Sequence, residues 1–163
     1  MADAGGLEEL VQLHHVRLLR LAYVLCGNEA EAEDIVADVF ARAWPRLSQG
    51  KVDEPAAYLR RSVVNAVASW RRHRFVVRRD ESRRRAEPLV ADTEERTAER
   101  DRLWPALRAL PMAQRQVVVL RFLEDLSEAD TAATLGVAPG TVKSRTARAL
   151  QALRESLGDD ADV

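Results

Sequence analysis

The 163-residue chain has few of the residues that build disulfides, metal centres and membrane spans. It has one cysteine, Cys26, which excludes an intrachain disulfide and a cysteine-based zinc site. No apolar run approaches the length of a membrane span, and the first ten residues lack the basic and apolar parts of a signal peptide. We therefore expect a cytoplasmic protein without membrane insertion, in which Cys26 is a small core residue.

The sequence also lacks the residue patterns of common enzymes. It has no HExxH, no GxSxG and no glycine-rich phosphate loop. His14 and His15 are adjacent, so they point to different sides of a helix and cannot chelate together, and His73 lies among arginines. We expect no catalytic residue, no metal and no cofactor.

The net charge of −1 hides a strong segregation of charge along the chain. Residues 1–54 contain ten acidic and five basic residues, whereas residues 60–85 contain ten arginines and two carboxylates. A neutral total built from opposed segments indicates two kinds of partner, one basic and one polyanionic.

Apolar residues recur at intervals of three and four in three segments of the first half. The first segment is 7–25, the second follows the amino cap Asn28, and the third begins at Pro55 and extends to about residue 73. In the second segment the inward residues are expected to be Ala32, Ile35, Val36, Val39, Phe40 and Ala43. In the third segment they are expected to be Ala56, Leu59, Val63, Ala66, Val67 and Trp70.

Two faces of these helices are candidates for binding. Asp34 and Asp38 are four residues apart, so two like charges share one face that would suit a basic partner; a merely solvated face is the alternative. The third helix has a polar, mainly cationic face formed by Tyr58, Arg60, Arg61, Asn65, Ser69, Arg71 and Arg72. Arginines neutralise phosphates, and aromatic or amide groups hold unstacked bases, so this face is typical of binding to melted DNA. For Tyr58, packing in the core is an equal alternative.

Residues 76–98 pass from a basic run to an acidic run without a sustained apolar period. They are therefore predicted to form a flexible linker between a first domain at 7–75 and a second at 99–157. In the second domain one helix contains Leu103 to Leu110, and Pro111 opens the next, which includes 114–123. An acidic tail follows at 158–163. The predicted fold is all-α, with two small helical domains.

Residues 127–157 have the plan of a helix-turn-helix. Ser127 can cap a short helix, Gly136 suits its left-handed carboxyl end, and Pro139 suits the first turn of a longer helix. Ala132, Gly136 and Val142 have the relative spacing of the small residue, the turn glycine and the buried aliphatic residue of such units. The second helix has a cationic face that can enter a major groove, formed by Lys143, Ser144, Arg145 and Arg148. An αα-hairpin with solvated cations is the alternative.

Taken together, these segments resemble bacterial RNA polymerase sigma factors of the extracytoplasmic-function (ECF, group IV) type. The resemblance extends from about residue 7 to residue 157. Its most specific parts are AEDIVADVFARAW at 32–44, YLRRSVVNAVASWRRHR at 58–74, and the stretch from LRALPMAQRQ to TVKSR at 107–145. It implies a promoter-specificity subunit, not an enzyme, that binds core RNA polymerase, recognises the −35 and −10 elements and assists promoter melting.

The resemblance implies a role for each candidate face. In the first domain, sigma region 2, the residues that would dock on the clamp coiled coil of polymerase β′ are Asp34, Asp38, Phe40 and Arg42. The polar face of the third helix would open and read the −10 element, with Asn65 near the captured non-template base. In sigma region 4, the residues that would meet the duplex −35 element are Thr141, Lys143, Ser144, Arg145 and Arg148. The polymerase β flap and an anti-sigma factor are further implied partners, and the linker would pass toward the RNA exit path.

Three positions depart from the family pattern. Thr131 and Thr146 replace aliphatic residues, and Ala138 replaces a frequent serine cap, so we expect weakened packing in the helix-turn-helix. Two other functions remain open: a stand-alone helix-turn-helix regulator, and a helical adaptor that binds no DNA. The first would need a dimerisation element, and no heptad seam or ligand domain is evident.

Overall fold

The computed structural model describes residues 4–77 and 98–158, and every regular element in those ranges is helical. The predicted all-α fold is therefore confirmed. The chain divides into two compact units, residues 1–89 and 90–163, each described here by itself. Of the predicted linker, residues 78–97 lie outside the described ranges, while 76–77 belong to a helix of the first unit and residue 98 begins one of the second. Most of the predicted acidic tail, 159–163, also lies outside them.

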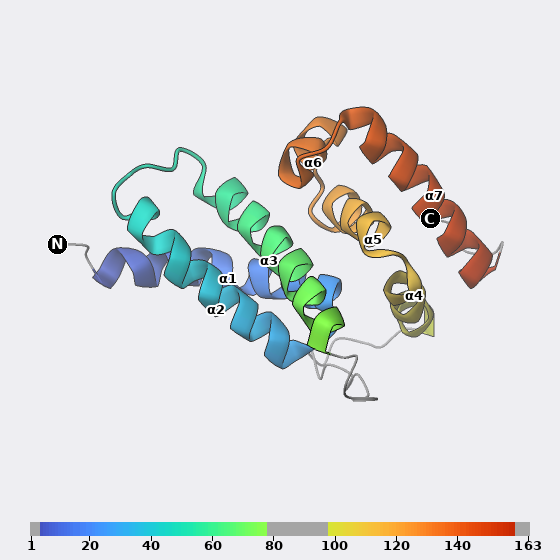
Figure 1. The fold of residues 1–163 in the computed structure, drawn as a ribbon, viewed down its shortest axis with the longest axis horizontal. Helices are drawn as coiled ribbons and strands as arrows, with labels where there is room; N and C mark the ends of the chain where they lie inside the picture. Colours follow the sequence, from blue (N-terminus) through green and yellow to red (C-terminus); the bar gives the residue numbers. More distant parts are fainter. Residues whose placement is uncertain (1–3, 78–97, 159–163) are drawn as a thin grey trace. The chain divides into compact units, whose positions relative to one another are not determined.

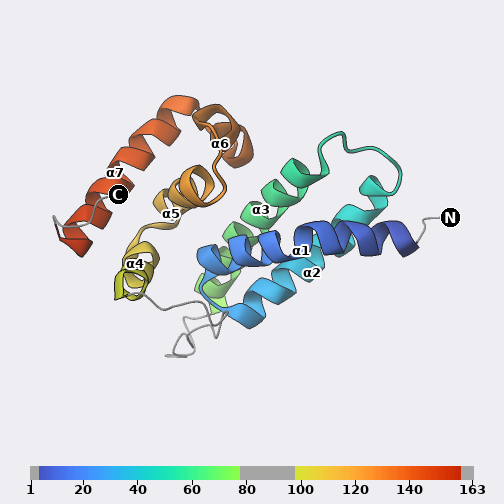
Figure 2. The ribbon, with the colours of Figure 1, turned by 180° about the vertical axis from the view of Figure 1, so that it is seen from behind.

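The first unit is a bundle of three helices. They are α1 (Ala4–Cys26), α2 (Glu29–Leu47) and α3 (Pro55–Val77), and each packs against the other two. Figure 1 shows α2 and α3 in front of α1, and the reverse view in Figure 2 shows α1 crossing them. The mutual packing closes one apolar core inside this unit.

Local sequence sets the boundaries of these helices. Gly27, at φ 81°, ends α1, and the Asn28 side chain accepts a hydrogen bond from the Glu31 amide at 3.0 Å, which caps α2 as predicted. α2 continues to Leu47, although Pro45 lies inside it. The proline removes only its own N–H donor, and the Ser48 amide still bonds to the Trp44 carbonyl at 2.8 Å.

The core of the first unit agrees with the predicted pattern in α2 and partly in α3. All six inward residues predicted in α2 are buried. In α3, Leu59, Val63 and Val67 are buried, but Ala56 is exposed, and Ala66 and Trp70 are half-buried. Val64, which the sequence analysis had not placed inward, is buried as well. The buried side of α3 is therefore wider than a single stripe.

The second unit contains α4 (Ala98–Ala109), α5 (Met112–Val118), a π-helical turn η1 (Val119–Leu123), α6 (Glu128–Leu135) and α7 (Pro139–Leu157). Pro111 precedes the start of α5 at Met112, as predicted, but the predicted single helix changes to π geometry at Val119. Two apolar clusters hold the unit. One joins α4, α5 and α7 through Ala106, Leu110, Val118, Ala149 and Leu153. The other joins α5, α6 and α7 through Val117, Ala132 and Val142.

The helix-turn-helix forms as the sequence predicts. The Ser127 hydroxyl accepts from the Asp130 amide at 3.0 Å, Gly136 ends α6 at φ 65°, and Pro139 opens α7. The sequence pattern predicts small apolar packing at Ala129, Ala132, Ala133 and Leu135 of α6. That prediction is wrong for Ala129 and Ala133, which are exposed. Ala132 is buried with Val117 and Val142, and Leu135 packs beside them.

Arginines support the second unit from within. Arg115 is 3% exposed, and its guanidinium donates to the carbonyls of Arg108 and Leu110 at the end of α4. Arg121 donates to the Leu126 carbonyl, and Arg102 donates to the Leu157 carbonyl at 2.7 Å. Arg115 and Arg102 thus bind carbonyls at the ends of α4 and α7, which have no intrahelical partners there, and Arg121 binds a carbonyl of the connection before α6.

Candidate nucleic-acid and docking interfaces

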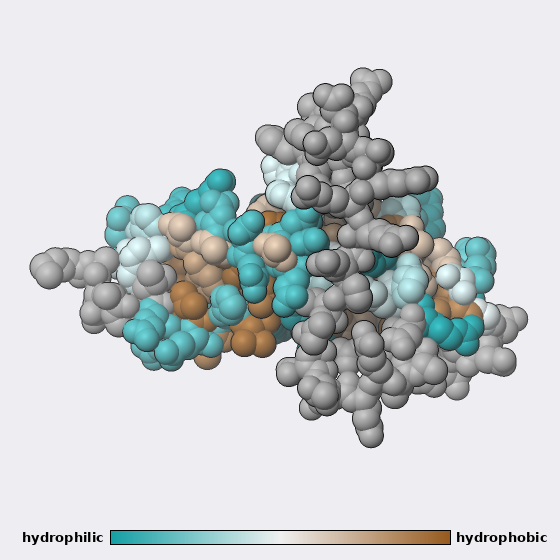
Figure 3. Space-filling model, turned by 90° about the horizontal axis from the view of Figure 1, so that it is seen from below, coloured by the Kyte–Doolittle hydropathy of each residue, from teal (hydrophilic) through white to brown (hydrophobic). Residues whose placement is uncertain are grey.

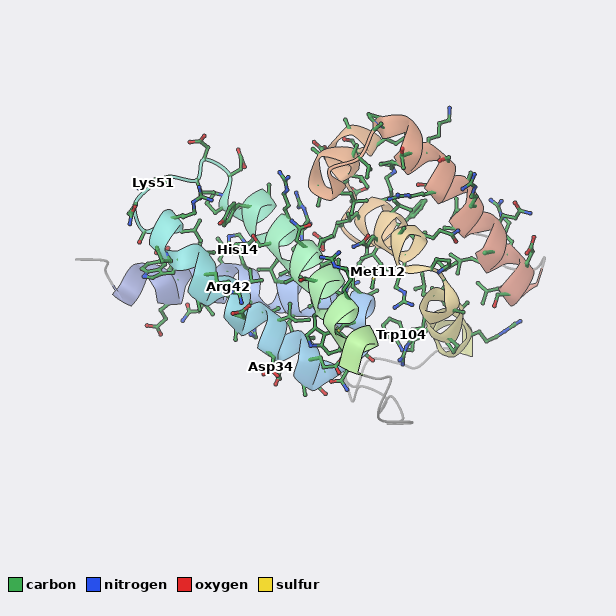
Figure 4. The ribbon with its side chains drawn as sticks, in the orientation of Figure 1. His14, Asp34, Arg42, Lys51, Trp104 and Met112 are labelled. Atoms are coloured by element: carbon green, nitrogen blue, oxygen red, sulfur yellow. The ribbon has the colours of Figure 1, made fainter. Side chains whose placement is uncertain are left out.

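The acidic face of α2 is accessible. Asp34 and Asp38 are both exposed, and Figure 4 shows Asp34 near the amino end of α2 with Arg42 further along. Arg42 Nε lies 2.9 Å from Asp38 Oδ1, and the side chains of Arg42 and Asp38 remain 80% and 49% exposed. An ion pair this exposed stabilises the fold little and can be exchanged for contacts with a partner. The same side of α2 also has three small exposed residues, Ala30, Ala37 and Ala41, which the sequence analysis had not singled out.

Phe40 differs from the other three residues predicted to dock on polymerase. It is 6% exposed, and its ring stacks on His15 of α1 with centroids 6.4 Å apart and planes at 18°. Phe40 therefore positions α2 against α1 from inside the bundle. Its periodicity with Val36 and Val39 already indicated an inward position.

Five of the predicted DNA-binding residues of α3 lie along one line of the helix. Their positions advance by three or four residues at each step, so they share a face. Arg61, Asn65 and Arg72 are exposed, and Tyr58 and Ser69 are half-buried. Two cations, an amide, a hydroxyl and an aromatic ring thus border the same strip of surface. This strip can contact both phosphates and unstacked bases.

Arg60 lies off that line. It is half-buried and its Nε is shielded from solvent, because the side chain starts from the side of α3 that packs on the core. The side chain of Arg71 lies outside the described residues. The sequence predicts one cationic face for the arginines of α3, whereas the helix places half-buried Arg60 away from exposed Arg61 and Arg72.

The recognition helix α7 shows a similar division. Thr141, Ser144, Arg145 and Arg148 follow one another at helical spacing along one side, next to the buried stripe of Val142, Ala149 and Leu153. Ser144 and Arg148 are exposed, whereas Thr141 and Arg145 are half-buried. Lys143 is exposed but lies on another flank of the helix. The Ser144 hydroxyl donates to the Thr141 carbonyl at 3.1 Å, so it is held in place near the amino end of α7.

The three departures noted in the sequence have different structural outcomes. Thr131 is fully buried, and its Oγ1 has no hydrogen-bond partner among the described residues, which is unfavourable. Thr146 is half-buried and donates to the Val142 carbonyl at 2.8 Å, so its hydroxyl is satisfied. Ala138 precedes α7 without a side-chain cap.

The described residues contain no group of three histidine, cysteine or carboxylate side chains arranged to bind a metal ion. Burial, and then the charge of Arg17, lower the pKa of His14, so its imidazole is neutral near pH 7. Cys26 is a free, half-buried thiol that donates to the Asn28 carbonyl at 3.3 Å. Within the described ranges no helix is both long and apolar enough to span a membrane.

Comparison with known proteins identifies both units. The family model Sigma-70 region 2 matches residues 10–75, and the model Sigma-70, region 4 matches residues 100–153. The chain is 38% identical to the RNA polymerase sigma-E factor of Streptomyces antibioticus over 152 residues, which cover 92% of this chain and 83% of that protein. It is 35% identical over 165 residues to the ECF RNA polymerase sigma factor SigM of Mycobacterium tuberculosis, with 96% and 79% covered.

Solved structures agree with this assignment. The sigma factor RpoE of Bartonella quintana, in complex with the anti-sigma factor NepR, matches with a TM-score of 0.80 at 26% identity, covering 94% of this chain and 98% of that one. CnrH in complex with the cytosolic domain of CnrY matches with a TM-score of 0.68 at 26% identity, covering 98% and 92%. The chain belongs to the ECF sigma factors of RNA polymerase. It is thus a promoter-specificity subunit that serves in the initiation of transcription.

Proposed function

We propose that three separate surfaces of this chain divide the work of promoter recognition. The exposed carboxylates of α2 dock on the clamp coiled coil of polymerase β′, the polar strip of α3 opens and reads the −10 element, and the exposed side of α7 contacts the duplex −35 element. The family membership supports this division. The observation on which it depends most is the strip of α3, because phosphate-binding and base-binding groups share one accessible line there.

The residues of the α3 strip have complementary chemistry for a melted strand. Arg61 and Arg72 neutralise phosphates at two points along the helix. Between them, Asn65 offers both a donor and an acceptor to the edge of an unstacked base. Tyr58, one turn before Arg61, offers a ring face for stacking. Arg60, half-buried and off the strip, supports the helix instead of reading a base.

The α2 face suits a basic helical partner. Asp34 and Asp38 supply charge, while the small side chains of Ala37 and Ala41 beside them let another helix approach closely. Docking can replace the exposed Asp38–Arg42 pair by contacts between Asp38 and a cation of the partner. Phe40 keeps this face in place from beneath through its stacking on His15.

In the second unit, Arg145 and Arg148 meet the −35 duplex, and Thr141 and Ser144 near the amino end of α7 bind a phosphate. Lys143, on its separate flank, contributes a more distant phosphate contact. Phe122, 56% exposed on η1, offers an apolar contact for the polymerase β flap. The linker at 76–98, most of it outside the described ranges, passes toward the RNA exit path.

Two further parts of the proposal concern regulation and location. The solved structures of RpoE with NepR and of CnrH with CnrY support an anti-sigma factor as a partner of this chain. As a polymerase subunit, the chain acts in the cytoplasm and catalyses no reaction of its own.

The docking surface is tested by charge reversal and co-elution with core polymerase. Asp34→Lys with Asp38→Lys should abolish co-elution, because two repulsive contacts replace two attractive ones. Glu29→Lys with Glu33→Lys is the matched control: it makes the same charge change at the same spacing on exposed positions of α2, displaced around the helix. Unchanged far-UV circular dichroism would show that both variants fold.

The outcomes separate the competing functions. Loss of co-elution only in the Asp34/Asp38 variant supports the proposal. Equal loss in both variants would mean that α2 attracts polymerase by general charge and has no specific docking face. If the wild-type chain binds duplex DNA specifically but not core polymerase, the stand-alone regulator replaces the proposal.

A further inference from the structure

The outer side of α1 has an exposed apolar pair that the functions above leave unused. Leu13 is 73% exposed and Val16 is 76% exposed, the two highest values among the large apolar residues of the described ranges. The inner side of the same helix buries Leu18, Leu21 and Leu25 against α2 and α3. Leu13 belongs to the apolar repeat that predicts the helix over 7–25, but the structure turns it to solvent. Apolar residues also reach the surface of this unit in the space-filling view of Figure 3.

Two charged residues continue the line of Leu13 and Val16 at both ends. Glu9 precedes Leu13 by four residues, and Arg20 follows Val16 by four. The successive positions are therefore four, three and four residues apart. This is the spacing of the a and d positions with which one helix contacts another. Glu9 and Arg20 are both exposed, and no hydrogen-bond or ion-pair partner is found for either within the described residues.

The pattern of these four positions is complementary to itself when two copies of α1 are paired antiparallel. In an antiparallel pair of α1 helices related by a twofold axis between Leu13 and Val16, Leu13 meets Val16 of the second copy. In the same register Glu9 meets Arg20 of the second copy. A self-complementary patch of this kind is the requirement for an isologous dimer. A parallel pair would instead bring Glu9 against Glu9 and Arg20 against Arg20.

We propose that the outer side of α1, centred on Leu13 and Val16, is a self-association surface that pairs two copies of this chain antiparallel. The charge complementarity of Glu9 and Arg20 selects a second copy over an unrelated helix. The contact is small, with two apolar residues from each copy, so the dimer is weak and forms in the high-micromolar range. It uses the side of α1 that faces away from α2 and α3, the helices of the proposed docking and −10 surfaces.

The test is a concentration series of the full chain by analytical ultracentrifugation. The wild-type chain should shift from monomer toward dimer between low and high micromolar concentration, and Leu13→Glu should remain monomeric. Leu103→Glu is the matched control, because it places the same charge on another partly exposed leucine, in the second unit, and should dimerise as the wild type does. Far-UV circular dichroism verifies folding of each variant.

A charge swap tests the antiparallel register. Glu9→Arg alone and Arg20→Glu alone should each weaken the dimer at least several-fold, because each brings like charges together. The double variant, Glu9→Arg with Arg20→Glu, should restore it, since the swapped residues again meet opposite charges. Failure of the double variant to recover would overturn the antiparallel pairing. A wild-type chain that stays monomeric at high micromolar concentration, with or without Leu13→Glu, would overturn the self-association surface itself.

Discussion

The two units use arginine differently, because among the described residues only the second unit has an arginine that is almost fully buried. In the first unit, Arg61 and Arg72 lie on the accessible strip of α3, and the core beneath them is aliphatic. In the second unit, Arg115 is almost fully buried and holds the carbonyl end of α4, while Arg102 and Arg121 hold two other carbonyls. An arginine-rich segment is therefore evidence for a nucleic-acid-binding surface only where the fold leaves the guanidinium groups exposed to solvent.

The units also differ in how completely their polar groups are satisfied. α2 begins with a side-chain cap from Asn28, whereas α7 begins at Ala138 without one. Thr131 buries a hydroxyl that has no hydrogen-bond partner among the described residues, beside the turn of the helix-turn-helix. We therefore expect the second unit to depend on a few specific polar contacts, and the first on its broad apolar core.

The strongest test of this contrast is Arg115→Met, which keeps much of the side-chain length but removes the guanidinium. Two carbonyls at the end of α4 lose their charged donor, so we expect a loss of about 3 kcal/mol in the unfolding free energy of the second unit. Arg61→Met should change stability by less than about 0.5 kcal/mol, because Arg61 is exposed. Thermal unfolding, with hydrogen exchange followed on peptides from each unit, measures both. Equal effects of the two substitutions would contradict the contrast.

A smaller effect is expected at the turn between α6 and α7. Gly136 has φ 65°, a left-handed conformation that costs other residues energy, so Gly136→Ala should destabilise the second unit by about 1 kcal/mol. Gly140 lies in the first turn of α7, where an added methyl group would meet open space, and Gly140→Ala should be neutral or slightly stabilising. Denaturant midpoints compare the pair. A loss at Gly140 as large as that at Gly136 would show that the turn geometry is not the cause.

The smallest expected effect on stability concerns the buried hydroxyl of Thr131. Thr131→Val replaces the unpaired hydroxyl by a methyl group of similar size, so it should stabilise the second unit by up to about 1 kcal/mol. Thr146→Val removes a hydroxyl that is already bonded to the Val142 carbonyl, and should bring no gain. The shift in melting temperature distinguishes them. A Thr131→Val variant that is less stable than wild type would mean that the hydroxyl has a partner after all.

Much of this fold follows from periodicity and capping residues. The inward set of α2, the Asn28 and Ser127 caps and the left-handed Gly136 were all predicted, because each depends on residues within a few positions. The π turn at Val119–Leu123 and the outward side of α1 at Leu13 were not predicted. Both depend on tertiary packing, which decides between positions that the sequence pattern treats alike.

The candidate site shows the same limit. Spacing alone predicts that Tyr58, Arg61 and Asn65 share a face, and the structure agrees. Spacing alone could not predict that Arg60, the neighbour of Arg61, would be half-buried, or that the Arg115 guanidinium would bind backbone carbonyls. Those outcomes follow from which side of each helix meets the core, information that lies in other segments of the chain.

The central claim is that α3 and α7 read different promoter elements. Run-off transcription with core polymerase, on promoter libraries in which the −10 and −35 elements vary separately, tests it most directly. We predict that Asn65→Ala lowers transcription about ten-fold and changes the dependence on −10 sequence only, while Arg148→Ala alters the response to the −35 element only. If Asn65→Ala left the −10 dependence unchanged, or if either variant altered both elements equally, the proposed division would be contradicted.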